Sequence, residues 1–162
     1  MKLHSIAALA VVLAPCQLAG QDTHAPRSNR SAVVVPAGTA LFGPAPDILP
    51  PGAKLAVLEG DPTKPGTYVM RLSMPDGYTI PPHAHPADEH VTVLEGTFLV
   101  GMGSTLDPAK FSSLAAGSFG MLPTGMQHFA RARGATVIQL HGAGPWSLSY
   151  VNPADDPRKK VR

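Results

Sequence analysis

The sequence predicts an all-β protein built from many short antiparallel strands, and three observations lead to that fold class. The 162 residues include 18 prolines and 16 glycines, which break or weaken helices. Hydrophobic residues make up 44% of the chain, enough for one core. Short segments that alternate apolar and polar residues are separated by turn residues such as Pro75-Asp76-Gly77, a pattern typical of a sandwich or barrel. A helical bundle, a coiled coil and a multidomain protein are excluded.

The charge pattern predicts no nucleic-acid partner. Thirteen Lys and Arg oppose eleven Asp and Glu, for a formal net charge of +2. The one basic cluster, Arg158, Lys159, Lys160 and Arg162, lies near the end of the chain and is typical of a solvated tail.

Residues 1–20 are interpreted as a signal peptide. Lys2 precedes the apolar run 6–14, which is too short to cross a bilayer because a spanning helix needs about 20 residues. The single cysteine, Cys16, follows this run in a context that resembles a bacterial lipoprotein signal, although Pro15 stands where a small residue is expected. We therefore expect a secreted or periplasmic protein. The alternative is a lipoprotein anchored to a membrane through Cys16.

The rest of the chain divides into an arm, one domain and a tail. Residues 21–52 form a polar linker and an irregular N-terminal arm, residues 53–151 the domain, and residues 152–162 a polar tail. The predicted strands are 33–35, 55–58, 67–74, 78–81, 89–94, 97–101, 118–122, 128–133, 136–141 and 146–151, the turns between them include Glu95-Gly96 and Arg133-Gly134, and the one predicted helix is 108–114.

Histidine is the compositional excess: five of the seven histidines fall between residues 83 and 141. Nearby prolines exclude a helix around His83 and His85, so these residues lie on extended chain and point to the same side. Glu89 follows after a turn, and His128 follows another turn at the start of a later strand. Imidazoles and a carboxylate are suitable ligands for a divalent first-row metal, and His128 is the natural fourth ligand if the strands face each other.

At these positions the sequence resembles the cupin superfamily. The first motif of that family is matched at Gly77, His83, His85, Glu89 and Gly96, and the second at Gly117, Pro123, Gly125 and His128. One position departs, because Ala132 stands where the family usually has Asn, a residue that is not a metal ligand there. The resemblance covers roughly residues 53–151.

This resemblance implies an RmlC-like cupin: one antiparallel jelly-roll β-barrel with an irregular N-terminal arm, of a kind that often pairs as a homodimer. It also implies one divalent transition metal (Fe, Mn, Ni, Cu or Zn) held inside the barrel. The implied ligands are His83, His85, Glu89 and His128.

Three further residues are candidates for contacts with a substrate or with the ligands. Gln139 and His141 alternate with Ile138 and Leu140, so either the polar pair or the apolar pair faces the barrel interior, and the sequence leaves both arrangements open. Arg71 is a candidate anchor for an anion.

The expected function is that of an exported metal-binding cupin, a metal-dependent enzyme acting on a small molecule. Dioxygenase-type oxidation is favoured, and an isomerase or a lyase is the other enzymatic possibility. The alternative is a non-catalytic cupin that binds or senses a small ligand through its metal. One barrel fold hosts many reactions, so the resemblance leaves the metal, the catalytic residues and the substrate open.

Overall fold

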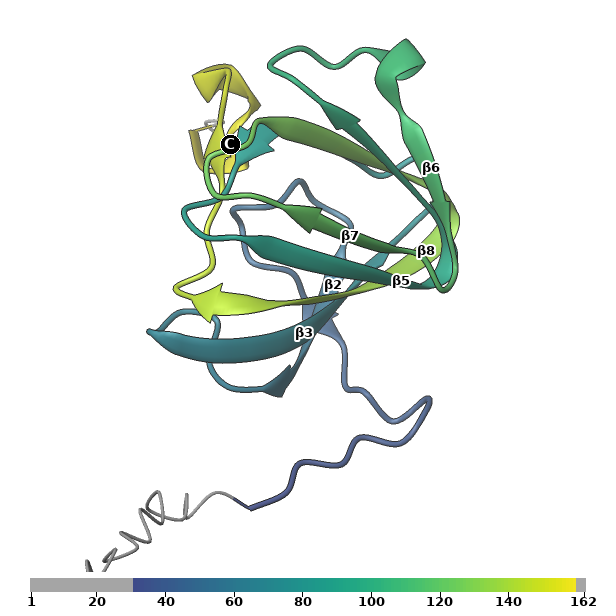
Figure 1. The fold of residues 1–162 in the computed structure, drawn as a ribbon, viewed down its shortest axis with the longest axis vertical. Helices are drawn as coiled ribbons and strands as arrows, with labels where there is room; N and C mark the ends of the chain where they lie inside the picture. Colours follow the sequence, from purple (N-terminus) through teal and green to yellow (C-terminus); the bar gives the residue numbers. More distant parts are fainter. Residues whose placement is uncertain (1–30, 160–162) are drawn as a thin grey trace, which may run out of the picture. The chain divides into compact units, whose positions relative to one another are not determined.

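The computed structural model describes residues 31–159. The predicted signal peptide, Cys16 and the linker up to residue 30 lie outside the described residues. The domain that begins at Val33 is mostly antiparallel β-sheet, with helix only as short 3-10 turns, which confirms the predicted fold class (Figure 1). Within the described range, no helix has the length and apolar character needed to cross a membrane.

Antiparallel strands form two layers joined by two long strands. The strands are β1 (Gly43–Pro44), β2 (Lys54–Glu59), β3 (Gly66–Met74), β4 (Thr79–Ala84), β5 (Glu89–Met102), β6 (Ser112–Ala115), β7 (Phe119–Leu122), β8 (His128–Gly144) and β9 (Ser149–Tyr150), with 3-10 turns at Pro108–Lys110, Pro153–Asp155 and Pro157–Lys159. Strand β8 pairs with β3, β4 and β5, while β5 also pairs with β6 and β7. The long strands β5 and β8 therefore carry the sheet from one layer to the other.

Strands β5 and β8 are continuous where the sequence predicts two strands and a turn in each. Gly96 and Gly134 lie where the β5–β8 register shifts, between the pairs Glu95–Val137 and Thr97–Arg133, and both have φ of +71°. A Cβ on Gly96 would lie only 2.3 Å from the Ala135 carbonyl oxygen. The predicted turns at these glycines were wrong because the extra residues are absorbed as bulges, which bend a strand without ending it.

Three other predicted elements differ from the structure. Residues 33–35 form no strand, since Val33 and Val34 are exposed and unpaired, and the arm pairs with the barrel through β1 instead. The predicted helix 108–114 is a single 3-10 turn, capped by the Asp107 side chain, that leads into β6. The predicted strand 146–151 shortens to β9.

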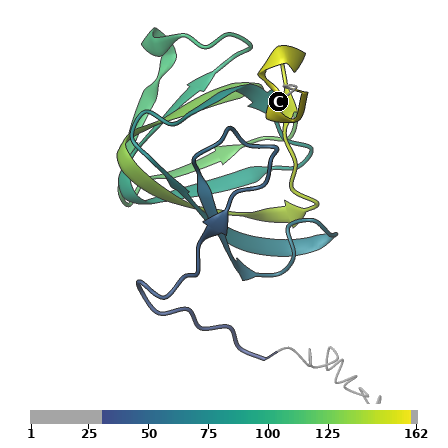
Figure 2. The ribbon, with the colours of Figure 1, turned by 180° about the vertical axis from the view of Figure 1, so that it is seen from behind.

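The arm is fastened across one side of the barrel (Figure 2). Its loop is closed by the hydrogen bond from Ala45 N–H to the Ala53 carbonyl at 3.2 Å. Two tyrosine hydroxyls from the barrel anchor it: Tyr78 donates to the Pro50 carbonyl at 2.6 Å and Tyr150 donates to the Ile48 carbonyl at 2.7 Å. This anchoring places Leu49 in the core.

Candidate metal centre

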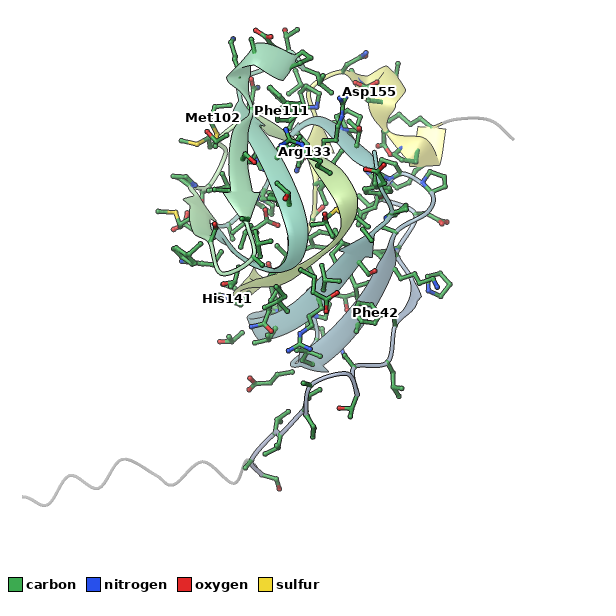
Figure 3. The ribbon with its side chains drawn as sticks, turned by 90° about the vertical axis from the view of Figure 1, so that its right-hand side faces the viewer. Phe42, Met102, Phe111, Arg133, His141 and Asp155 are labelled. Carbon is green, nitrogen blue, oxygen red and sulfur yellow. The ribbon has the colours of Figure 1, made fainter. Side chains whose placement is uncertain are left out.

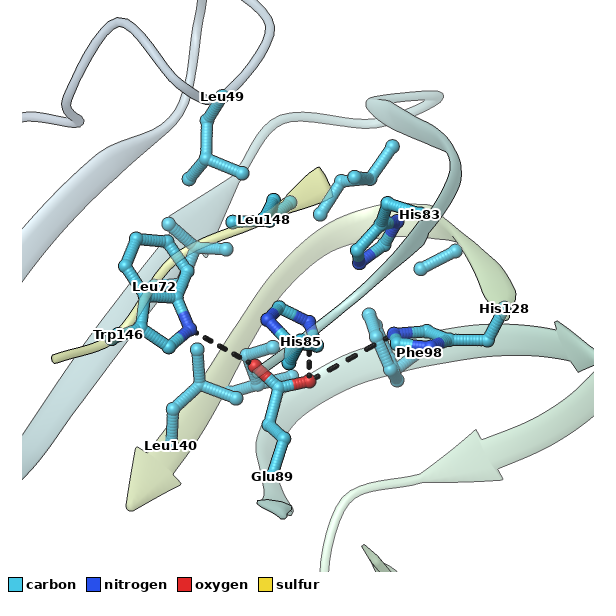
Figure 4. Close-up of a pocket in the computed structure, with 13 residues that line it drawn as sticks. Leu49, Leu72, His83, His85, Glu89, Phe98, His128, Leu140, Trp146 and Leu148 are labelled. Carbon is cyan, nitrogen blue, oxygen red and sulfur yellow. Dashed lines mark hydrogen bonds and ion pairs between the residues drawn. The ribbon is translucent and has the colours of Figure 1, made fainter. Parts of the chain in front are cut away.

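The four predicted metal ligands converge inside the barrel (Figure 4). His83 lies on β4 directly opposite His128, the first residue of β8, and His85 follows β4. One ring nitrogen of each histidine lies within 4.8 Å of those of the other two. Glu89, the first residue of β5, joins them from a third strand. All four are buried, with 2–6% of their surface exposed.

The three imidazoles are oriented by hydrogen bonds to the main chain. Each Nδ1 lies within hydrogen-bond distance of a backbone carbonyl, and donation from Nδ1 leaves Nε2 unprotonated and free to bind a metal. The acceptors are the carbonyls of Pro81 for His83 at 2.7 Å, Ser147 for His85 at 2.7 Å, and Met126 for His128 at 3.0 Å. The Nε2 atom of His85 is buried without a hydrogen-bond partner. The lone pair of this nitrogen and the carboxylate oxygen of Glu89, 3.3 Å away, are both donors that a bound cation would satisfy, so the residues fit a metal ion.

Glu89 supplies negative charge to the same centre. Its Oε2 lies 3.3 Å from Nε2 of His85 and 3.9 Å from Nε2 of His128. Burial by itself would raise the pKa of Glu89, but the neighbouring histidines, His85 foremost, outweigh burial and lower the pKa to about 2. Burial, together with His128 and His85, lowers the pKa of His83 to about 3. The carboxylate is therefore charged and His83 neutral at physiological pH, as metal ligation requires. Burial lowers the pKa of His85, but Glu89 outweighs burial and raises that pKa, so a metal ion must displace a proton there.

The space around these ligands is small and otherwise apolar. About 20 Å³ is open to the centre of a water-sized sphere, and a single water needs roughly 10–15 Å³ by this measure. The other lining residues are Leu49, Leu72, Ile80, Phe98, Ala130, Ile138, Leu140, Trp146 and Leu148. Among the described residues that line the cavity, the four candidate ligands are the only ionisable ones.

The remaining candidate residues lie on the outer face of the sheet. Ile138 and Leu140 line the cavity, so Gln139 and His141 point away from it. Arg71 also faces outward and its Nε donates to Oε1 of Gln139 at 3.2 Å. His141 lies on the outside of the barrel (Figure 3), where its ring stacks on His90 with centroids 4.8 Å apart. Of the seven predicted site residues, the fold therefore brings four together at the candidate metal centre and places the other three on the outer face of the sheet.

Two residues at the centre were not assigned to it from the sequence. The Trp146 indole Nε1–H donates to Oε1 of Glu89 at 3.3 Å. The indole ring stacks on the His85 ring, with the two ring centroids 6.2 Å apart. The sequence analysis assigns no role at the centre to Trp146, although the need of a buried indole N–H for a hydrogen-bond partner was a signal. Leu49 reaches the cavity from the arm, and nothing in its local sequence indicates that contact.

Comparison with known families agrees with this geometry. Residues 31–147 match the family of ChrR cupin-like domains, which is most of the chain. The chain belongs to this cupin family. A germin-like protein, 5-1 of Oryza sativa subsp. japonica, is 36% identical over 93 residues, which cover 57% of this chain and 42% of that protein. The rhicadhesin receptor of Pisum sativum is 38% identical over 96 residues, which cover 54% and 44%. The cupin thus spans less than half the length of these plant relatives.

Solved structures show the same fold at low sequence identity. A candidate acetylacetone dioxygenase from Methylibium petroleiphilum superposes with a TM-score of 0.61 at 18% identity, covering 81% of this chain and 88% of that one. An RmlC-like cupin from Shewanella frigidimarina gives a TM-score of 0.53 at 17% identity, covering 70% and 91%. The predicted RmlC-like cupin jelly roll is therefore confirmed. Three buried histidines that could hold a metal ion lie inside it.

Proposed function

We propose that this cupin is an exported protein that binds one divalent transition metal through His83, His85, Glu89 and His128 and oxidises a small molecule with dioxygen. The observation that carries the proposal is the convergence of three oriented imidazoles and one charged carboxylate in a cavity without other ionisable groups. Reactions that need a separate protein acid or base, such as many isomerisations and eliminations, gain less support from such a lining. The fold shared with a candidate dioxygenase points the same way.

The residues of the chain have defined tasks in this proposal. A redox-active metal would supply the electron transfer to dioxygen. The carbonyls of Pro81, Ser147 and Met126 hold the imidazoles in one tautomer, and Trp146 orients Glu89. The apolar walls keep bulk water from the reacting groups. In a dioxygenation both oxygen atoms enter the product and the organic substrate supplies the electrons, so no external reductant is required.

A second function, ligand binding without turnover, is favoured by one observation. The free space beside the ligands is about 20 Å³, room for one water-sized group. A metal held there could bind a very small ligand, or a larger ligand after a wall residue moves, with no reaction following. The protein would then serve as a sensor or carrier.

Metal analysis and oxygen uptake distinguish the two functions. The protein is purified from its native compartment, its metal is identified, and oxygen consumption is measured with candidate small molecules. Iron, manganese, nickel or copper with substrate-dependent oxygen uptake supports the dioxygenase-type function. Zinc with no uptake overturns it and leaves the binding function. His141→Ala, which removes a histidine from the outer face, is the matched control and should behave like the unchanged protein.

Export and pairing as a homodimer are parts of the proposal that rest on the sequence. Fractionation of native cells tests export, and recovery of the protein with the cytoplasm would overturn it. Sedimentation analysis of the purified protein tests the dimer.

A further inference from the structure

A cleft much larger than the metal cavity lies on the outside of the barrel beneath the arm. Its volume is about 1000 Å³. Its walls come from three parts of the described chain, the arm, strand β4 and the C-terminal 3-10 turns: Pro44, Ala45, Asp47, Leu49, Pro50, Pro51, Gly52, Ala53, Thr79, Pro81, Asp155, Pro157 and Arg158. A cleft of this size is large enough for a small organic molecule, whereas the metal cavity would admit one only after a wall residue moves.

Leu49 separates this cleft from the metal cavity. Among the described residues it is the one side chain that lines both spaces. It is 3% exposed, and Figure 4 shows it on the arm loop, facing Leu148 at the end of the cavity away from Glu89. A molecule in the cleft therefore meets the isobutyl group of Leu49 before it meets a metal ligand.

The arm loop holds Leu49 in that position. The hydroxyls of Tyr78 and Tyr150 bond to the carbonyls of Pro50 and Ile48, the residues on either side of Leu49. Because the backbone is pinned at both neighbours, the part that can move most easily is the Leu49 side chain itself. A rotamer change of this one side chain requires no unfolding of the arm loop.

We infer that the cleft under the arm is the entrance to the metal site and that Leu49 is the gate that limits which molecules pass. This inference rests on the proposed metal site and adds its route of access and its size limit. Leu49 acts as a specificity-determining residue, since its bulk sets the size of molecule that reaches the ligands.

The charges of the cleft restrict the class of molecule that enters. Asp47 and Asp155 line it, and the guanidinium of Arg158 is already paired with the Asp156 carboxylate at 2.7 Å. The lining therefore carries a net negative charge, which disfavours the binding of multiply charged anions. Its proline-rich walls offer apolar contact. The favoured guest is a small, uncharged, partly apolar molecule.

A third cavity offers a competing route. It lies between Tyr68 and the segment around Pro145 and shares His85, Glu89 and Trp146 with the metal cavity. It has no space for a water-sized sphere. Passage there would require movement of the Trp146 indole, which is hydrogen-bonded to Glu89.

The test compares two leucine variants that delete the same side-chain atoms from the wall of the metal cavity. Leu49→Ala removes the wall toward the cleft, whereas Leu148→Ala enlarges the cavity without opening it, because Leu148 lines only the metal cavity. Imidazole, a small neutral ligand, is mixed with the Co²⁺-loaded protein, and its association rate is followed by visible absorption. We expect an increase of about tenfold or more in Leu49→Ala, equivalent to about 1.4 kcal/mol in the barrier, and little change in Leu148→Ala. Leu49→Val is the milder variant if Leu49→Ala does not fold, and it should accelerate binding in the same direction.

A metal-free measurement separates this inference from the proposed function. Trp146, the single tryptophan, lines the metal cavity, so acrylamide quenching of its fluorescence reports access in the apoprotein. Quenching should increase in Leu49→Ala more than in Leu148→Ala. Failure to bind Co²⁺ would overturn the proposed function while quenching still tests the gate. The gate hypothesis would be overturned if the two alanine variants changed imidazole association and quenching equally, or if neither Leu49 variant changed them. It would also be overturned if Trp146→Leu alone accelerated imidazole binding.

Discussion

Replacing Trp146 by Phe tests how the protein holds Glu89, the candidate carboxylate ligand. The substitution keeps an aromatic ring beside His85 and removes the indole N–H that donates to Oε1 of Glu89. A hydrogen bond to a charged group contributes about 1.5–3 kcal/mol. At 3.3 Å this bond is longer than the roughly 2.7–2.9 Å typical of charge-assisted bonds, so the lower value of about 1.5 kcal/mol applies. We therefore expect metal affinity to fall by about tenfold.

Chelator competition near neutral pH measures that change. Phe98→Leu is the control, since Phe98 lines the same cavity without a hydrogen bond to Glu89, and its metal affinity should stay within about twofold of the unchanged protein. The reasoning fails if Trp146→Phe binds metal as tightly as the unchanged protein. It also fails if Phe98→Leu weakens binding as much.

Three further predictions concern the ligand charge, the bulges and the C-terminal turns. Glu89→Gln keeps the side-chain size and removes the charge, so metal affinity in a chelator competition should fall by about tenfold or more while the circular dichroism spectrum is retained; unchanged affinity would exclude Glu89 as a ligand. Gly134→Ala should cost about 1–2 kcal/mol in urea unfolding because its φ is positive, and Gly96→Ala should cost more because its Cβ would also meet the Ala135 carbonyl oxygen; equal costs would contradict the close approach. Arg158 lowers the pKa of Asp156 to about 2, below its ordinary 3.8, so the stability from this carboxylate is present above pH 3.8 and is lost as pH falls toward 2. Asp156→Asn should accordingly lower the Tm at neutral pH, and its difference from the unchanged protein should narrow over that range; a constant difference would contradict the ion pair.

The candidate metal ligands could be predicted because their geometry is set locally. Prolines beside His83 and His85 force extended chain, and extended chain puts both imidazoles on one side. His128 follows a turn that fixes where its strand begins, and the pairing of His83 with His128 then needs only a barrel in which the two strands meet.

The rest of the centre depends on contacts between distant parts of the chain. Whether Gln139 or Leu140 faces inward depends on the side of the sheet that the core covers, and strand alternation alone is symmetric on that point. Leu49 and Trp146 reach the cavity from segments of irregular structure, so no periodic pattern indicates them. The glycines at positions 96 and 134 predict a turn and a bulge equally well, because both require positive φ.

Metal stoichiometry tests the central claim most directly. The purified protein, loaded with Co²⁺ or Zn²⁺ and then desalted, should retain about one ion per chain, with His83, His85, Glu89 and His128 as its ligands. His83→Ala and His128→Ala should each retain almost none, whereas His141→Ala should still retain about one. Stoichiometric metal in the His83 and His128 variants, or equal loss in the His141 variant, would contradict a metal centre inside this barrel.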